Sequence, residues 1–146
     1  MNNKFMMNQN LIYYPCFALL LLCFLVLLKL FLSRVHAVKK GKIDFRYFKT
    51  FNLNQPVDVP QDIQQAARNF TNLFEVPTLF FMVCLFGLYT QNVDSLFLGL
   101  AWFYVALRYI HSLIHLTTNK LFQRMTSYAL SCLILLAMGI YLACKI

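Results

Sequence analysis

Four long runs of apolar residues alternate with shorter polar connections along this chain, at residues 12–32, 70–89, 95–114 and 128–144. A helix needs roughly 20 apolar residues to cross the hydrocarbon core of a bilayer, and each run approaches that length. The pattern predicts an all-α membrane protein, a four-transmembrane-helix bundle that forms one domain over residues 1–146. The expected helices cover about residues 12–33, 61–89, 95–116 and 125–144.

The second helix is expected to begin before the membrane. Pro60 suits the opening of a helix, and Asp62 carries the negative charge that a helix N-terminus favours. The turns that follow are polar, and the apolar run starts near Phe70. The sequence therefore predicts one long helix whose first turns lie in the cytosol.

Composition agrees with the membrane interpretation. The chain is 60% hydrophobic and 12% charged, whereas a soluble domain is about 45–50% apolar and about 25% charged. These values exclude a disordered chain, a nucleic-acid-binding domain and an ordinary cytosolic enzyme. The net charge of +8 does not indicate a nucleic-acid partner, because the basic residues flank the apolar runs and form no separate patch.

The distribution of Lys and Arg predicts the orientation. Six of them lie between residues 34 and 49, none at 90–94, and two at 115–127. Cytoplasmic connections collect Lys and Arg, so the first and third connections are expected in the cytoplasm and both termini outside it. The first run is too long for a signal peptide and is followed by Arg34 instead of a small-residue cleavage site. It is therefore expected to remain as a membrane anchor.

The five cysteines are odd in number and contain no Cys-x-x-Cys pair, and the three histidines are not at metal-ligand spacings. This pattern predicts neither a metal site nor a disulfide framework. The cysteines are expected to act as small buried apolar residues.

Polar residues interrupt the second helix on one side. Arg68, Asn72 and Glu75 lie within roughly 60° of one another on a helix, and Glu75 is the only glutamate in the chain. An ionisable group inside a membrane segment is costly and is a candidate functional residue.

The third and fourth helices carry similar groups at the same membrane level. Arg108, His111 and His115 also share a face of roughly 60°. Arg124 and Tyr128, four residues apart, share a face where the fourth helix begins. Three helices thus bring polar side chains to the cytoplasmic half of the bundle, where each must point away from lipid.

These residues allow two interpretations. In the first, Glu75 and Asn72 pair with the arginines to fix helix packing, and arginine side chains extend to the lipid headgroups. In the second, the excess of guanidinium groups over one glutamate (Arg68, Arg108 and Arg124) forms a site for an anionic ligand. The residues alone leave both open.

The motifs resemble those of a known family. The run Arg68-Asn-Phe-Thr-Asn72-Leu-Phe-Glu75-Val-Pro77 is similar to the Arg-x-x-x-Asn-x-x-Glu-x-x-Pro signature of the MAPEG family, the membrane-associated proteins in eicosanoid and glutathione metabolism. A second block is similar in spacing to the family's third and fourth helices and comprises Arg108, His111, His115, Arg124 and Tyr128. The neighbourhood of Asn119 is closest to bacterial members, which implies the bacterial inner membrane.

The resemblance implies a homotrimer that binds glutathione as co-substrate between subunits, near the cytosolic side. Glutathione would be held by residues of the second and third helices, namely Arg68, Asn72, Glu75, Arg108, His111 and His115. The residues implied in catalysis are Arg124, which would stabilise the thiolate, and Tyr128 beside it.

Two functions are consistent with such a site. The first is a glutathione-dependent transferase or peroxidase acting on lipophilic electrophiles, which reach the site through the surrounding membrane lipids. The alternative is a non-catalytic membrane trimer that binds a lipid headgroup or a partner through the same cationic pocket.

Overall fold

The computed structural model of this chain describes residues 8–50 and 58–146, and within them every regular element is helical. The elements are η1 (Gln9–Ile12), α1 (Tyr13–Lys39), α2 (Tyr47–Thr50), α3 (Gln61–Tyr89), α4 (Ser95–Leu116) and α5 (Leu121–Ala143). Four segments are long and apolar enough to cross a membrane, namely η1 with α1, then α3, α4 and α5. The structure thus confirms the predicted all-α, four-helix membrane fold. The chain is an integral, multi-pass membrane protein.

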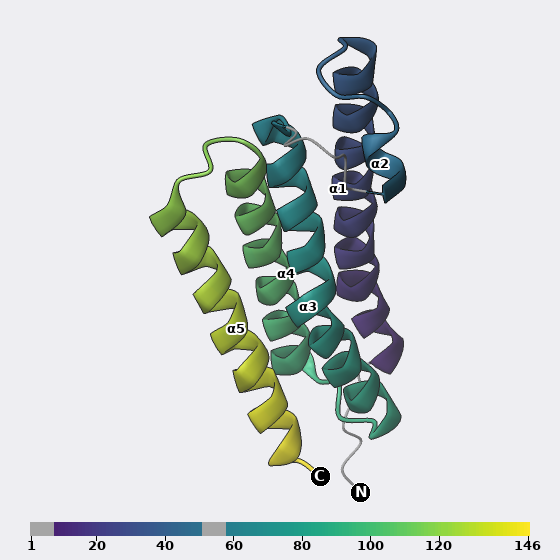
Figure 1. Ribbon diagram of the computed structural model, residues 1–146. Helices are drawn as coiled ribbons and strands as arrows, with labels where there is room; N and C mark the ends of the chain where they lie inside the picture. Colours follow the sequence, from purple (N-terminus) through teal and green to yellow (C-terminus); the bar gives the residue numbers. More distant parts are fainter. Residues whose placement is uncertain (1–7, 51–57) are drawn as a thin grey trace, which may run out of the picture.

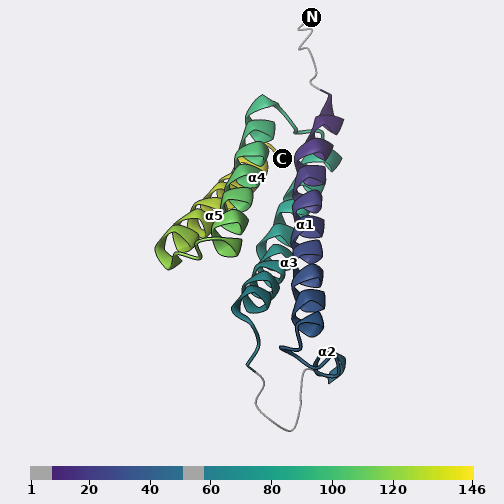
Figure 2. The same ribbon diagram turned by 90° about the horizontal axis from the view of Figure 1, so that it is seen from above.

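The four long helices form two pairs that lie side by side (Figures 1 and 2). α1 packs mainly on α3, and α5 packs mainly on α4, while α3 also contacts α4. The α3–α4 turn and the C-terminus lie at one end of the bundle, here called the C-terminal end. The α4–α5 turn and α2 lie toward the other end, here called the α2 end.

The helices bury one face each and expose apolar side chains on the other. In the core, the rings of Phe80 and Tyr104 stack with centroids 4.5 Å apart, between α3 and α4. On the outside of α1, Phe24, Leu28 and Phe31 are all exposed. A contiguous apolar surface of this kind would be a liability in water but matches the hydrocarbon core of a bilayer.

α1 extends to Lys39, six residues beyond the expected end near residue 33. The basic segment after the apolar run contains no helix breaker until Gly41, which adopts φ +65°. There the helix ends in a Schellman motif, in which Gly41 N–H donates to Val38 (2.9 Å) and Lys42 N–H to Ala37 (3.0 Å). The helix therefore ends where the backbone requires glycine and not where the charges begin.

α5 begins at Leu121, about four residues before the expected start. Asn119 adopts a left-handed φ of 48°, and its N–H donates to the Ile114 carbonyl (2.7 Å). Asparagine tolerates this conformation, so the α4–α5 connection is a tight turn. The early start brings Arg124 into the first turn of α5.

Polar contacts hold the C-terminal end together. The Gln9 side chain donates to the Val93 carbonyl (2.9 Å) and accepts from the Val93 N–H (2.8 Å). Asp94 forms an ion pair with Lys145 and accepts a hydrogen bond from Tyr141. Desolvation opposes ionisation of Asp94, but the hydrogen bonds, foremost that from Lys145, lower its pKa to about 2.

A close helix contact at Gly87 gives a first stability prediction. A Cβ atom at Gly87 would lie 2.9 Å from Cε1 of Phe97, whose ring is fully buried and has no room to move. We expect Gly87→Ala to lower the free energy of unfolding by about 1–3 kcal/mol through overpacking. Thermal unfolding in detergent measures this loss.

Gly99→Ala is the matched control, because a Cβ at Gly99 meets no atom within 4 Å. Alanine is the better helix former by about 1 kcal/mol, so this variant should be as stable as the parent or slightly more stable. Equal stability of both variants would contradict the contact described at Gly87.

Candidate functional site: a buried guanidinium without a counter-ion

Arg108 of α4 lies at the centre of the polar residues near the α2 end, and its side chain is 0% exposed. Its Nη2 donates to the backbone carbonyl of Asn72 on α3 (2.8 Å). Its Cζ lies 5.5 Å from the ring centroid of Tyr128 on α5. Nε and Nη1 are buried and make no hydrogen bond to any described residue. The Arg108 guanidinium thus contacts two other helices and has two nitrogens without a hydrogen-bond partner among the described residues.

No carboxylate of the described residues forms an ion pair with Arg108; the ion pair found in residues 8–50 and 58–146 joins Asp94 to Lys145 at the C-terminal end. A buried charge without a partner is costly, because desolvation is not repaid by attraction to an opposite charge. An anionic group bound beside Arg108 would supply that attraction and would accept hydrogen bonds from the unused nitrogens.

Two buried histidines line α4 next to Arg108. The rings of His111 and His115 lie 5.7 Å apart. Nδ1 of His111 is 3.0 Å from the carbonyl oxygen of Arg124, so this nitrogen carries the proton and donates it. Nε2 of His111 and Nδ1 of His115 make no hydrogen bond to any residue that the structure describes. Each ring therefore has one buried nitrogen without a hydrogen-bond partner among the described residues.

α5 contributes Arg124 and Tyr128. Arg124 is half-buried, and its Nη1 donates to the side-chain oxygen of Asn119 (2.7 Å), which holds the guanidinium at the turn. The Tyr128 ring lies 5.7 Å from that of His111 and beneath Arg108. The α5 residues therefore contribute a third helix to the site.

The three polar residues predicted on α3, unlike those of α4, are not fully buried inside the bundle. Arg68 and Glu75 are exposed on the outside of this chain, and Asn72 is half-buried. No ion pair of the described residues joins Glu75 to Arg68 or Arg108. The first interpretation, in which Glu75 neutralises an arginine within one chain, is therefore not supported by the geometry.

A polar pair inside the bundle was not predicted from the sequence. Asn69 is fully buried, and its side-chain oxygen accepts a hydrogen bond from Ser112 (3.1 Å). Its Nδ2 has no partner of the described residues. Asn69 shares a helix face with Leu73 and Phe80, and that shared face was the available signal that it points inward.

An apolar groove begins next to the site. A cavity of about 660 Å³ lies between α3 and α5. The lining residues nearest the α2 end are Val76 and Cys132. Val76 follows Glu75 directly, and Cys132 lies one turn after Tyr128. An apolar molecule in this groove would therefore have its end close to the polar residues.

The whole length of the helical region matches one family model. The MAPEG family model covers residues 12–144, which includes all four long helices and every residue of the site. The chain belongs to the MAPEG family. No curated protein and no solved structure gave a significant match.

In this MAPEG chain, five of the expected site residues come together within one subunit, from α4 and α5: Arg108, His111, His115, Arg124 and Tyr128. The α3 residues divide, since the backbone of Asn72 contacts Arg108 while Arg68 and Glu75 face outward. The roles expected for these residues remain predictions. A site that used all of these residues would need a further molecule against the outer face of α3.

Proposed function

We propose that this MAPEG protein is a glutathione-dependent transferase or peroxidase that acts on lipophilic electrophiles. The observation that carries the proposal is the fully buried guanidinium of Arg108, which has two unused nitrogens and no counter-ion in the described residues. A tripeptide with two carboxylates supplies the missing anionic partner. The family is one whose members include glutathione transferases and peroxidases, which agrees with that chemistry.

The proposed roles follow the chemistry of each side chain. Arg68 and Arg108 bind carboxylates of glutathione, and Glu75 binds its ammonium group. Asn72, His111 and His115 donate or accept the remaining hydrogen bonds. Each of these groups recognises an end or an amide of the peptide, and none of them is needed at the sulfur.

The reacting sulfur is assigned to α5. A guanidinium favours the thiolate over the thiol, so Arg124 lowers the pKa of the glutathione thiol. Tyr128 lies beside Arg108 and His111, one helical turn before Cys132, which lines the groove. The thiolate then attacks the electrophilic atom of a substrate in the groove, a new bond to sulfur forms, and the leaving group takes the electron pair.

We further propose a homotrimer. Exposed Glu75 must be shielded from lipid, and a neighbouring subunit on α3 would shield it and complete the glutathione site. The number three comes from the family resemblance, and native mass spectrometry at moderate detergent is expected to show trimers.

The proposed orientation has both termini outside the cytoplasm of a bacterial inner membrane. Its support is the contrast between the basic first connection and the uncharged side chains of residues 90–92. We expect an impermeant maleimide to label Asn92→Cys from outside intact cells, but Lys40→Cys only after permeabilisation. The exposed Cys144 must be removed first. Labelling of position 40 from outside would reverse the orientation.

Isothermal calorimetry of glutathione with the detergent-purified protein tests the proposed function. The expected result is saturable binding that survives an excess of a soluble lipid phosphate. Displacement by the lipid phosphate, or no binding of glutathione, would favour the non-catalytic trimer that holds a lipid headgroup or a partner.

Glu75→Gln separates binding from packing. Because Glu75 is exposed and has no ion-pair partner of the described residues, the variant should keep the thermal stability of the apo protein. Loss of a charge-assisted hydrogen bond worth about 1.5–3 kcal/mol should lower the affinity for glutathione by roughly tenfold to more than a hundredfold. Calorimetry and thermal unfolding measure the two effects.

The opposite pattern would contradict the proposed role of Glu75. Breaking a buried ion pair costs about 3–5 kcal/mol, so a strongly destabilised variant with unchanged affinity would mean that Glu75 is a packing residue. Asp62→Asn, on the exposed first turn of the same helix, is the matched control: it should leave the affinity unchanged and lower the stability by no more than about 1 kcal/mol, the value of a charge at a helix N-terminus.

A further inference from the structure

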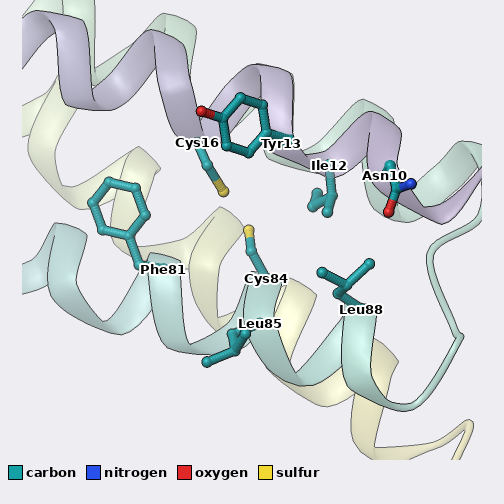
Figure 3. Close-up of a pocket in the computed structure, with 8 residues that line it drawn as sticks. All are labelled: Asn10, Ile12, Tyr13, Cys16, Phe81, Cys84, Leu85 and Leu88. Carbon is teal, nitrogen blue, oxygen red and sulfur yellow. The ribbon is translucent and has the colours of Figure 1, made fainter.

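Two cysteines face each other at the C-terminal end of the bundle, away from the polar site. Cys16 lies in the first turn of α1 and Cys84 near the end of α3. Both side chains line one cavity between the two helices. Figure 3 shows the two sulfur atoms pointing toward one another across the space between the helices. Two thiols in contact can form one covalent bond between α1 and α3.

The pair borders a cavity of about 340 Å³. The cavity is lined by apolar and uncharged polar side chains, namely Asn10, Ile12, Tyr13, Phe81, Leu85 and Leu88. Cys16 is partly exposed, whereas Cys84 is 2% exposed. Cys16 is therefore the more accessible of the two residues.

The helices are held at this spacing by contacts on both sides of the pair. On the side of the pair nearer the C-terminal end, the Gln9 side chain makes two hydrogen bonds with Val93, of 2.9 and 2.8 Å. On the side nearer the α2 end, Leu19 and Phe80 are both fully buried in the core. A disulfide requires two Cβ atoms about 4 Å apart, so contacts that hold α1 and α3 in register on both sides of the pair favour its formation.

We propose that Cys16 and Cys84 form a reversible dithiol–disulfide couple that exchanges with small, uncharged disulfides entering this cavity. The sulfur of Cys16 attacks the external disulfide, a mixed disulfide forms, and one external thiol leaves. The sulfur of Cys84 then attacks the mixed disulfide at Cys16, and the second external thiol leaves. The two protein thiols lose two electrons and two protons, which the external disulfide gains as it becomes two thiols.

The side chains that line the cavity determine which class of external disulfide can react. Among the residues that the structure describes, no charged side chain lines the cavity, and moving a charged group into apolar surroundings carries a large desolvation cost. An uncharged disulfide should therefore react much faster than a charged one of similar size. If the proposed orientation is correct, this end of the bundle faces an oxidising compartment, in which disulfides persist.

The experiment uses the full chain in detergent with Cys132 and Cys144 replaced by alanine. These two thiols are partly exposed and exposed, respectively, and would otherwise react with the probe. Dithiodipyridine is the uncharged probe, and release of thiopyridone is followed by absorbance. We expect about two equivalents per chain, no retained adduct, and a peptide containing Cys16 linked to Cys84 by mass spectrometry. Dithiobis(nitrobenzoate), a dianion, should react at least about tenfold more slowly.

Single substitutions in this background assign the steps. Cys84→Ala should release about one equivalent and retain a pyridylthio group on Cys16, because nothing resolves the mixed disulfide. Cys16→Ala should slow the reaction by about tenfold or more, because the remaining sulfur is buried. Cys23→Ala, which removes another buried cysteine of α1, should behave like the background chain.

A stability measurement gives an independent readout. Oxidation should raise the thermal midpoint of the background chain by several degrees, because the new bond restrains the unfolded chain, and should not change that of Cys16→Ala. The proposal is overturned if the folded chain does not react with dithiodipyridine while the unfolded chain does. It is also overturned if both sulfurs retain adducts without forming a link, or if Cys16→Ala reacts as fast as the background.

Discussion

Arg108→Met is expected to abolish most glutathione binding while leaving the apo fold as stable as the parent or more stable. Methionine fills a similar volume, and it removes a buried charge that no described carboxylate neutralises. Replacing buried charges with apolar residues is often neutral or stabilising. The affinity should fall by more than about a hundredfold, since several charge-assisted hydrogen bonds of about 1.5–3 kcal/mol each are lost together.

Calorimetry and thermal unfolding of the same samples separate the two effects. Arg46→Met is the matched control, because Arg46 is exposed in the basic connection, outside the site, and its substitution should change neither quantity. Arg108→Lys keeps the charge but loses the planar fork of donors, so it should bind glutathione with intermediate affinity. An unfolded Arg108→Met variant would instead indicate that the guanidinium holds the helices together.

Arg124→Ala should reduce turnover far more than binding. Removing a donor that stabilises charge in the transition state costs about 10²–10³-fold in kcat, whereas the ends of the peptide are assigned to other side chains. The measurement is conjugation of glutathione to a lipophilic chloronitrobenzene, with calorimetry for affinity. The pH profile of kcat should also move to higher pH, because the thiol loses the cation that lowers its pKa.

Asn119→Gly tests whether the position of Arg124 matters as well as its charge. Glycine accepts the left-handed φ of 48° at this turn, but the hydrogen bond from Arg124 Nη1 is lost. We expect a loss of about tenfold in kcat, through misplacement of the guanidinium, with the α4–α5 turn retained. Equal turnover of Arg124→Ala and the parent would contradict the thiolate role and leave Arg124 as a structural residue.

The fold was predictable because its signal is long and repeated. Each apolar run has the length that a bilayer requires, and the structure confirms four such helices. The ends of the helices were less predictable. Basic residues after residue 33 indicated a connection, yet long basic side chains are good helix formers, and α1 continues to Lys39.

The site was predictable in part, for a geometric reason. Arg108, His111 and His115 have apolar neighbours on other faces of α4, so the inward direction of their stripe was clear, and all three are buried. On α3 two adjacent faces both carry polar residues. The sequence does not indicate which face packs inside one chain, and Asn69 points inward while Arg68 points outward.

The cysteine pair shows what periodicity does not reveal. Cys16 and Cys84 belong to helices separated by the whole basic connection, and neither lies in a recognisable motif. Their contact depends on the relative rotation and height of α1 and α3, which depend in turn on packing between the two helices. A pattern along one helix contains no information about that register.

The exposed glutamate on α3 has a consequence for how the chain exists in a membrane. Glu75 lies about 20 Å along the helix from its end at Tyr89, at 1.5 Å per residue, and so falls within a hydrocarbon core of about 30 Å. An ionised side chain at the centre of the core costs about 2.5–3.5 kcal/mol on insertion scales, which is the upper range for Glu75. A solitary subunit would carry that penalty, and an assembled one would not. Association would then be thermodynamically linked to insertion, so that the population of single subunits, and with it the apparent stability, varies with the amount of protein in the bilayer.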